Sequence, residues 1–467
     1  MRPRPLRLLV TLLLACCLAA CADGAAAPVN GSPGVGDPLF PTAGNGGYDV
    51  GHYGLDLSYD PPSGRIEATA ALTATAREPL ASFDLDLSGL TVTSVTVGGR
   101  SADFSRKGTE LVVTPAQPLP AGRRFETTVV YQGVPGLLTD PDGSQEGWFH
   151  TDDGGALALG EPVGSMAWFP GDDHPSDKAT YDITVTVPHP MTVVANGELA
   201  GTAPRPGGRT AFHWHVAQPM ATYLATVAIG DYTVQRSRTA SGLPVYTAVD
   251  PRSDDPQTAA SLARIPEIVD WESSIFGPFP FSSTGAVVAH LGDRQGGYAL
   301  ETQNRPTFPG NEGTPAVPVT TLVHELSHEW FGDWVTPHNW QDIWLNEGFA
   351  TYTEWLWKDH EGVATEEQSA QAAFADADNW AFAPASPDAK QVFAPAVYGR
   401  GALVLHELRR ALGDKAFFRM LRAWPAAHPY GNASTQEFTA FCADFTGKNL
   451  TPLFATWLYG RARPAHL

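Results

Sequence analysis

The chain has 467 residues, of which 43% are hydrophobic and 17% are charged. This is the composition of a folded, soluble protein, and the length favours two or three domains over one. The formal net charge of −20 argues against nucleic acid and anionic lipid surfaces as partners, because both repel a strongly acidic protein.

The first twenty residues have the pattern of a targeting segment. Several arginines precede an apolar stretch over 8–18, which is short for a helix that spans a bilayer. The stretch ends in Leu-Ala-Ala-Cys21, which resembles a bacterial lipobox, where cleavage precedes a cysteine that carries lipid. We therefore predict a signal peptide over 1–20 and an extracytoplasmic protein, lipid-anchored through Cys21 to the bacterial cell membrane. An uncleaved anchor, a plain secretory signal and a weaker lipobox at Cys16 are the alternatives.

The segment 21–47 is rich in Ala, Gly, Pro, Asn and Ser and contains few large residues. Such a composition predicts a flexible tether between the lipid and the first domain. Once the cysteines of the first 21 residues are removed or lipidated, only Cys442 remains. No disulfide can then form within the mature chain.

From Tyr48 to about residue 240, large apolar residues alternate with smaller or polar ones. The clearest runs with this period of two are 53–59, 83–87, 125–131 and 183–187. Turn sequences such as Asn196-Gly197 separate them. Many short strands with turns between them predict an all-β domain, a saddle or sandwich, over 48–242.

From residue 243 the spacing of apolar residues indicates a second domain of α+β class, over 243–467. Strands are predicted at 245–249 and 286–291. Helices are predicted at 258–275, 316–334, 340–360, 399–411, 414–423 and 435–446. The C-terminal half of this domain is therefore mostly helical.

The predicted helix over 316–334 contains His324-Glu325-Leu326-Ser327-His328, which matches the H-E-x-x-H template. Residues four apart lie on one face of a helix, so both imidazoles can reach one metal ion. Glu325 is then placed to take a proton from a water that the metal activates. The structural alternative is a pair of core histidines that bond to backbone carbonyls.

A third ligand follows after eighteen intervening residues, since Glu347 lies about two turns into the next predicted helix. Asn339 is the expected N-cap of that helix. The interval is long enough to end one helix, turn, and bring a carboxylate back beside His324 and His328. Two histidines and one glutamate leave the fourth position of one Zn²⁺ to water, as in a catalytic zinc site.

The stretches 324–333 and 344–352 resemble the aminopeptidase N family of gluzincin zinc metallopeptidases, which also contains leukotriene A4 hydrolase. The resemblance covers nearly the whole mature chain, because 53–57, 168–173 and 220–224 are similar to the family's N-terminal saddle domain. It implies a thermolysin-like catalytic domain and a zinc-dependent aminopeptidase acting on peptide substrates. A monomer is expected.

The resemblance also implies roles for three residues outside the zinc motif. Glu301 lies where the family has Gly-x-Met-Glu-Asn and would bind the α-ammonium of the substrate, and Glu161 would add a second contact to the same amine. Tyr398, in Val-Tyr-Gly-Arg-Gly, would stabilise the oxyanion. Ordinary loop glutamates and a core tyrosine are the alternatives. The match around Glu301 is imperfect at three positions: Tyr298, Leu300 and Thr302.

Larger members of the family continue into a helical superhelix that closes over the active site, whereas this chain ends at Leu467. The sequence therefore does not determine how far the cleft is enclosed or how long a substrate it accepts. An endopeptidase or another zinc hydrolase, and a non-catalytic lipoprotein that binds peptide or zinc, are the alternative functions. The intact Glu325 argues against the last, because holding zinc does not require it. The preferred N-terminal residue cannot be inferred, because pocket residues come from scattered loops.

Overall fold

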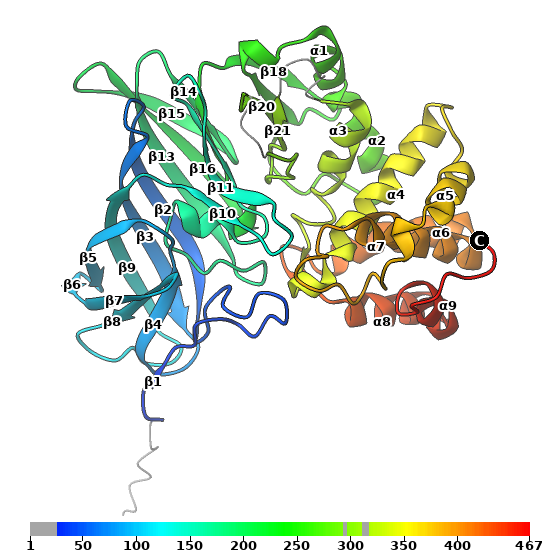
Figure 1. Ribbon diagram of the computed structural model, residues 1–467, viewed down its shortest axis with the longest axis horizontal. Coiled ribbons are helices and arrows are strands. Elements are labelled where there is room, and N and C mark those ends of the chain that lie inside the picture. The colour runs from blue at the N-terminus through cyan, green and yellow to red at the C-terminus, as the bar shows by residue number, and fades with distance from the viewer. Residues whose placement is uncertain (1–25, 293–296, 311–316) are drawn as a thin grey trace, which may run out of the picture.

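The structure is a computed structural model that describes residues 26–292, 297–310 and 317–467. A β-rich N-terminal part and an α+β C-terminal part lie side by side (Figure 1). The C-terminal half of the second part is mostly helical. The predicted fold class is therefore confirmed.

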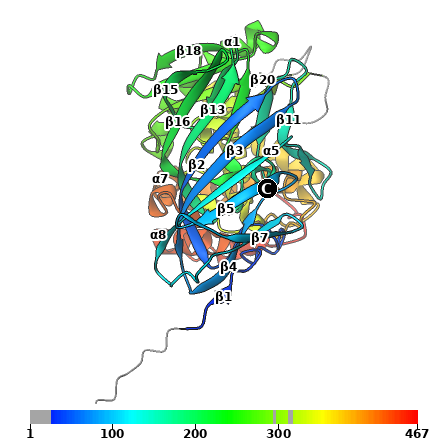
Figure 2. The ribbon, with the colours of Figure 1, turned by 90° about the vertical axis from the view of Figure 1, so that its left-hand side faces the viewer.

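The N-terminal part contains three β-sheets. The largest has eight strands in the order β15-β16-β13-β2-β3-β9-β5-β6, most of which Figure 2 shows side by side. The smaller sheets have the orders β10-β11-β12-β17-β14 and β1-β4-β8-β7. The strand bounds are β1 Val29–Asn30, β2 Tyr48–Asp60, β3 Arg65–Ala76, β4 Leu80–Asp86, β5 Thr91–Val97, β6 Arg100–Ser101, β7 Asp103–Lys107, β8 Glu110–Thr114, β9 Arg124–Gly133, β10 Leu137–Thr139, β11 Gln145–His150, β12 Ala156–Leu159, β13 Lys178–Pro188, β14 Thr192–Ala195, β15 Glu198–Arg205, β16 Arg209–Ala221 and β17 Val227–Gly230.

Alternation along β2 explains how this sheet buries one face. Tyr53, Leu55, Leu57 and Tyr59 are at most 2% exposed, and the residues between them are more exposed. Successive side chains of a strand point to opposite faces, so the apolar set lies in the core. The period of two in the sequence therefore indicated both the strand and its buried face.

The prediction of a flexible tether over 21–47 is wrong for its described part. Strand β1 pairs in parallel with β4, and Asp37 is only 1% exposed. Its Oδ2 accepts hydrogen bonds from Trp340 N at 2.7 Å and lies 3.2 Å from His174 Nε2. Gly44 has a φ of +70°, and a Cβ there would lie 2.6 Å from His174 Cβ. The small residues of this segment allow its backbone to pack closely against distant parts of the chain, such as His174.

The second part begins earlier than predicted. Its sheet has the order β18-β19-β20-β21, with bounds β18 Thr233–Arg238, β19 Pro244–Val249, β20 Thr284–His290 and β21 Thr307–Gly310. The boundary at 242/243 falls within the β18–β19 hairpin, since Thr233 already pairs with Val249. Strand β18 is an edge strand whose residues are mostly exposed, so it lacks the apolar alternation that would have revealed it.

The helices agree with the predicted ones within a few residues at most ends. Their bounds are α1 Pro256–Leu262, α2 Ile265–Phe276, α3 Val319–Ser327, α4 Trp344–His360, α5 Glu366–Ala375, α6 Gly401–Leu412, α7 Asp414–Ala427, α8 Thr435–Thr446 and α9 Thr451–Trp457. The predicted helix at 258–275 is split into α1 and α2. The short strands β22 (Thr336–Pro337) and β23 (Asn432–Ala433) pair with each other.

Helix α3 ends seven residues before the predicted end at 334, and His328 is its C-cap residue. Gly332 has a φ of +145°, a conformation that no helix allows and that only glycine adopts readily. The chain therefore bends back, and Asp333 N donates to His328 O at 2.9 Å. Asn339 has the extended conformation of an N-cap, but its side chain makes no capping bond, contrary to the prediction.

The N-terminal part holds the loop that follows α3. Lys178 Nζ, at the start of β13, donates to the carbonyl oxygens of Asp333 and Trp334 at 2.8 and 3.2 Å. Tyr223 Oη donates to Gly332 O at 3.1 Å. These contacts fix the loop after α3 against the N-terminal part. The position of the residues on α3 therefore depends on both parts of the chain.

The predicted lipid attachment at Cys21 and the signal peptide lie outside the described residues. Within the described ranges, no helix combines the length and the hydropathy needed to cross a membrane. Cys442 is buried and free.

Candidate active site

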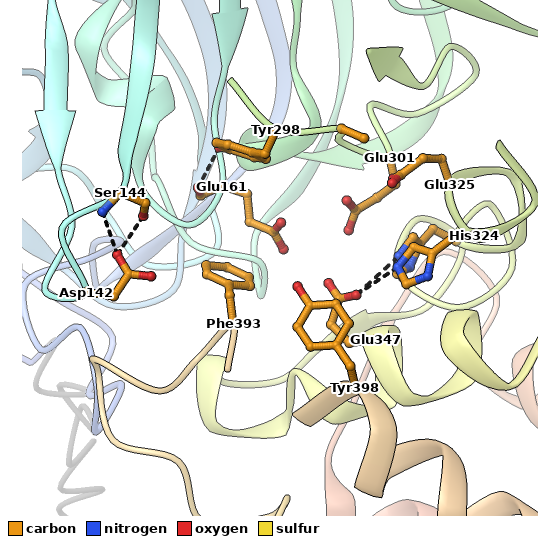
Figure 3. A pocket seen from close by; sticks show the side chains of 12 residues that line it. Asp142, Ser144, Glu161, Tyr298, Glu301, His324, Glu325, Glu347, Phe393 and Tyr398 are labelled. Carbon is orange, nitrogen blue, oxygen red and sulfur yellow. Dashed lines mark hydrogen bonds and ion pairs between the residues drawn. The ribbon is translucent and has the colours of Figure 1, made fainter. Parts of the chain in front are cut away.

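Helices α3 and α4 bring the three predicted metal ligands together. His324 Nε2 lies 3.1 Å and His328 Nε2 3.6 Å from Glu347 Oε2 (Figure 3). The three ligand atoms lie within 4.8 Å of one another, and all three residues are buried. Two imidazole nitrogens and a carboxylate oxygen that converge in this way suit Zn²⁺.

Both histidines are oriented by a partner on the other ring nitrogen. His324 Nδ1 lies 2.9 Å from Oε1 of Glu354, which follows Glu347 by about two turns of α4. His328 Nδ1 lies 2.9 Å from Phe331 O. A proton on Nδ1 leaves the lone pair of Nε2 free for a metal. The bend at Gly332 is what brings the carbonyl of Phe331 to His328. The donor set therefore fits a zinc ion in orientation as well as in type.

The charges around the triad keep Glu347 ionised. Burial opposes its charged form, but His328 and His324 outweigh this effect and lower its pKa to about 2. Glu325 lies beside the triad, and burial raises its pKa to about 8 against the opposing influence of both histidines. A divalent cation at the triad would favour the ionised form of Glu325.

Glu161 and Glu301 face the triad from the two parts of the chain. They are 5% and 2% exposed, and in each the Oε1 atom has no hydrogen-bond partner among the described residues. One oxygen of each lies within 4.8 Å of the other and of Glu347. Burial raises the pKa of both. Two buried carboxylates at this separation, each with an oxygen that lacks a hydrogen-bond partner among the described residues, form a site for a cationic group.

The loop that carries Glu161 is held by residues that the sequence did not single out. Glu146, on β11, accepts the N–H of Val163 with both oxygens, at 3.2 and 3.0 Å. Tyr298 Oη donates to Glu161 O at 2.7 Å. The tyrosine that departs from the family motif therefore ties the two glutamate loops together.

Tyr398 is brought over the triad by a short π-helix, Ala396–Arg400, that leads into α6. Its ring lies nearly parallel to that of His324, with centroids 6.1 Å apart. Gly348 on α4 and Gly401 on α6 permit this approach, since a Cβ on either would lie 2.9 Å from a backbone atom of the other. Burial raises the pKa of Tyr398, which keeps its hydroxyl protonated and able to donate.

All seven predicted active-site residues, Glu161 included, line one cavity of about 220 Å³. Of the remaining lining residues, Tyr298 and Ala299 belong to the stretch around Glu301, whereas Asp142, Ser144 and Phe393 come from segments in which the sequence showed no motif. The full lining is Asp142, Ser144, Glu161, Tyr298, Ala299, Glu301, His324, Glu325, His328, Glu347, Phe393 and Tyr398. Figure 3 shows the carboxylates of Glu161, Glu301 and Glu347 turned toward the same space.

Comparison with known proteins yields matches over both parts. The peptidase family M1 domain matches residues 314–457, and the peptidase M1 N-terminal domain matches residues 50–224. Aminopeptidase M1 of Arabidopsis thaliana is 25% identical over 66% of this chain. Endoplasmic reticulum aminopeptidase 1 of Rattus norvegicus is 25% identical over 70% of it. The chain spans only 37% of the length of each of these two relatives.

Solved structures match over a larger share of both chains. The M1 zinc metallopeptidase from Deinococcus radiodurans is 29% identical, with a TM-score of 0.84, and the match covers 92% of this chain and 98% of that one. A variant of a two-domain M1 zinc metallopeptidase bound to L-arginine is 28% identical, with a TM-score of 0.83 and the same coverage. A variant from Deinococcus radiodurans bound to a Tyr-Ser-Ala substrate is likewise 28% identical, with a TM-score of 0.84.

Proposed function

The chain belongs to peptidase family M1, and from this premise we propose that it is a zinc-dependent aminopeptidase that removes N-terminal residues from peptides. One observation carries the proposal. Two buried carboxylates, Glu161 and Glu301, each with an Oε1 atom that has no hydrogen-bond partner among the described residues, lie beside a buried histidine–histidine–glutamate triad in one cavity. Such a pair binds an α-ammonium group and thereby fixes the first peptide bond next to the metal. Solved relatives bound to L-arginine and to a Tyr-Ser-Ala substrate support this assignment.

His324, His328 and Glu347 would hold the zinc ion, which supplies Lewis-acid polarisation of the scissile carbonyl and activation of the attacking water. Glu325 accepts the proton of that water and passes it to the leaving amine. Its place beside the triad and its burial keep the proton transfer away from bulk solvent.

Tyr398 and the glutamate pair complete the reaction site. The phenol of Tyr398 donates a hydrogen bond to the oxyanion that develops on the scissile carbonyl. Glu161 and Glu301 bind the α-ammonium, and the cationic ligand relieves the repulsion between their carboxylates. Substrates without a free amine lose this contact, so the site favours exopeptidase action.

The departures from the family motif around Glu301 do not favour an endopeptidase. Tyr298 bonds to the Glu161 loop, and Leu300 is fully buried and pairs with Thr307. Thr302 Oγ1 donates to Arg305 O at 2.6 Å. Each of the three residues that differ from the family motif therefore has a bonding partner in this fold. Glu301 still faces the cavity.

Free and N-acetylated peptides with the same sequence distinguish the candidate functions. We expect the purified protein to hydrolyse the free peptides one residue at a time, at least about 100-fold faster than the acetylated ones, and a chelator to abolish the activity. Equal cleavage of both would point to an endopeptidase. Zinc binding without any hydrolysis would point to a binding protein.

We further propose that the protein is a monomer anchored outside the cytoplasmic membrane through a lipid on Cys21. Packing of the fold begins at Val29, whose N–H donates to Pro79 O. Residues 22–28 would then form the whole link, which spans at most about 25 Å when extended. A link of this length would keep the β-rich part close to the membrane, in contrast to the long tether predicted from composition.

Cys21→Ser is expected to move the protein from the membrane fraction to the soluble extracytoplasmic fraction, because no helix within the described ranges is long and apolar enough to cross the bilayer. Membrane fractionation after a salt wash measures this change, with peptidase activity as the check that folding is retained. A variant that still sediments with membranes would support an uncleaved N-terminal helix instead.

A further inference from the structure

The cavity extends beyond the glutamate pair, away from the metal triad. Asp142 and Ser144 line this end, and they belong to the loop between β10 and β11. Phe393 comes from the segment before the π-helix. Figure 3 shows Phe393 between Asp142 and Tyr398, with Tyr298 across the cavity. The far end is therefore an extension with aromatic walls and a carboxylate at its mouth.

The substrate part that enters this extension follows from the proposed function, on which this inference rests. The scissile carbonyl lies at the triad and the α-ammonium lies between Glu161 and Glu301. An aminopeptidase substrate has no residue before the α-ammonium. The side chain of its first residue is therefore the group available to fill the space toward Asp142.

The chemistry of Asp142 favours a cation in that space. Its Oδ1 accepts hydrogen bonds from Ser144 N at 2.8 Å and from Ser144 Oγ at 2.6 Å, which fixes the carboxylate. Its Oδ2 has no hydrogen bond and no ion pair with any residue of the described ranges. Ser144 thus orients Asp142 and leaves one oxygen free for a ligand.

The rest of the lining supplies no competing cation, because it includes no lysine or arginine among its described residues. In the proposed complex the charges of Glu347, Glu161 and Glu301 are offset by the metal and the α-ammonium, so Asp142 is the carboxylate left for the side chain of the first residue. That carboxylate would repel the side chain of an N-terminal aspartate or glutamate. The faces of Phe393 and Tyr298 suit the methylene stem of a long cationic side chain and the cation itself.

We propose that Asp142 is a specificity-determining residue that selects peptides with arginine or lysine at the N-terminus. The side chain of the first residue runs between the aromatic walls, and its charged end bonds to the free oxygen of Asp142. Arginine gains more than lysine, because its planar guanidinium can bind a carboxylate through two hydrogen bonds and stack on an aromatic ring.

The test compares kcat/KM for arginyl, lysyl, leucyl, alanyl and glutamyl 4-nitroanilides. We expect the wild-type enzyme to favour the arginyl and lysyl substrates over the leucyl one by about tenfold or more. Asp142→Asn should lower kcat/KM for the arginyl and lysyl substrates by about tenfold. It should change kcat/KM for the leucyl and alanyl substrates by less than about twofold. Asparagine keeps the acceptor for Ser144, so this variant removes the charge and not the loop contact. Asp142→Lys should raise the glutamyl value above the arginyl one.

Asp103→Asn is the control, because it removes the same charge at an exposed residue of β7 that lies outside the cavity lining. It should leave the order of substrates unchanged. The inference is overturned if the wild type cleaves the leucyl substrate as well as the arginyl one, or if Asp142→Asn lowers all substrates equally. Either result would leave the proposed aminopeptidase activity intact. A protein that cleaves none of the five substrates would instead contradict the proposed activity.

Discussion

Glu325→Gln is expected to lower kcat by about 10²- to 10⁴-fold while the protein keeps its zinc. Glutamine has nearly the same shape as glutamate but cannot accept the proton of the attacking water. Glu325 is buried beside the triad and is not one of its three converging ligands in our assignment. Single-turnover kinetics and metal analysis of the same preparation measure the two effects separately.

Variants of the ligands provide the contrast. His328→Ala and Glu347→Ala each remove one of three donors, so we expect them to lose the metal and, with it, the activity. All three variants should be compared for metal content and for thermal unfolding after dialysis. Zinc depletion in Glu325→Gln equal to that in His328→Ala would contradict this division of roles.

Glu301→Ala is expected to lower kcat/KM for free-amine substrates by roughly 30- to 1000-fold and to have little effect on the residual cleavage of N-acetylated ones. A hydrogen-bonded charge pair in a dehydrated cleft is worth about 2–4 kcal/mol, which corresponds to this range. Glu301 is buried and faces the triad, so the loss should appear without any change in zinc content. Glu301→Gln, which keeps the volume, tests whether the charge is what matters.

Glu161→Ala and the double variant test whether the two glutamates bind the same amine. Oxygens of both lie within 4.8 Å of each other, so the two changes should not add independently. Strictly additive losses would mean that the residues contact different parts of the substrate. A loss for N-acetylated substrates equal to that for free ones would assign Glu301 a structural role.

The sequence by itself determined those features that depend on neighbouring residues. A spacing of four places His324 and His328 on one helix face, and the same helix periodicity located Glu347 on α4. The alternation at 53–59 indicated both a strand and its buried face. These patterns are local, because a helix or strand repeats its geometry over a few residues whatever the rest of the chain does.

The resemblance to a known family added Glu161, Glu301 and Tyr398 as candidates, and the structure shows how they reach one cavity. Glu146 and Tyr298 hold the two glutamate loops, and glycines on α4 and α6 allow Tyr398 to approach. None of these supporting contacts follows a periodic pattern. They join residues far apart in the chain, so only the folded arrangement of the two parts reveals them.

Tertiary structure alone decided three further features. The composition of 21–47 predicted a tether, yet Asp37 accepts a hydrogen bond from Trp340 N, which is 303 residues away in the chain. Lys178 and Tyr223 hold the turn after α3, in which Phe331 O lies 2.9 Å from His328 Nδ1. Asp142 reaches the cavity from a hairpin loop of the other part. Each depends on long-range partners, and composition and periodicity carry no information about which distant groups will meet.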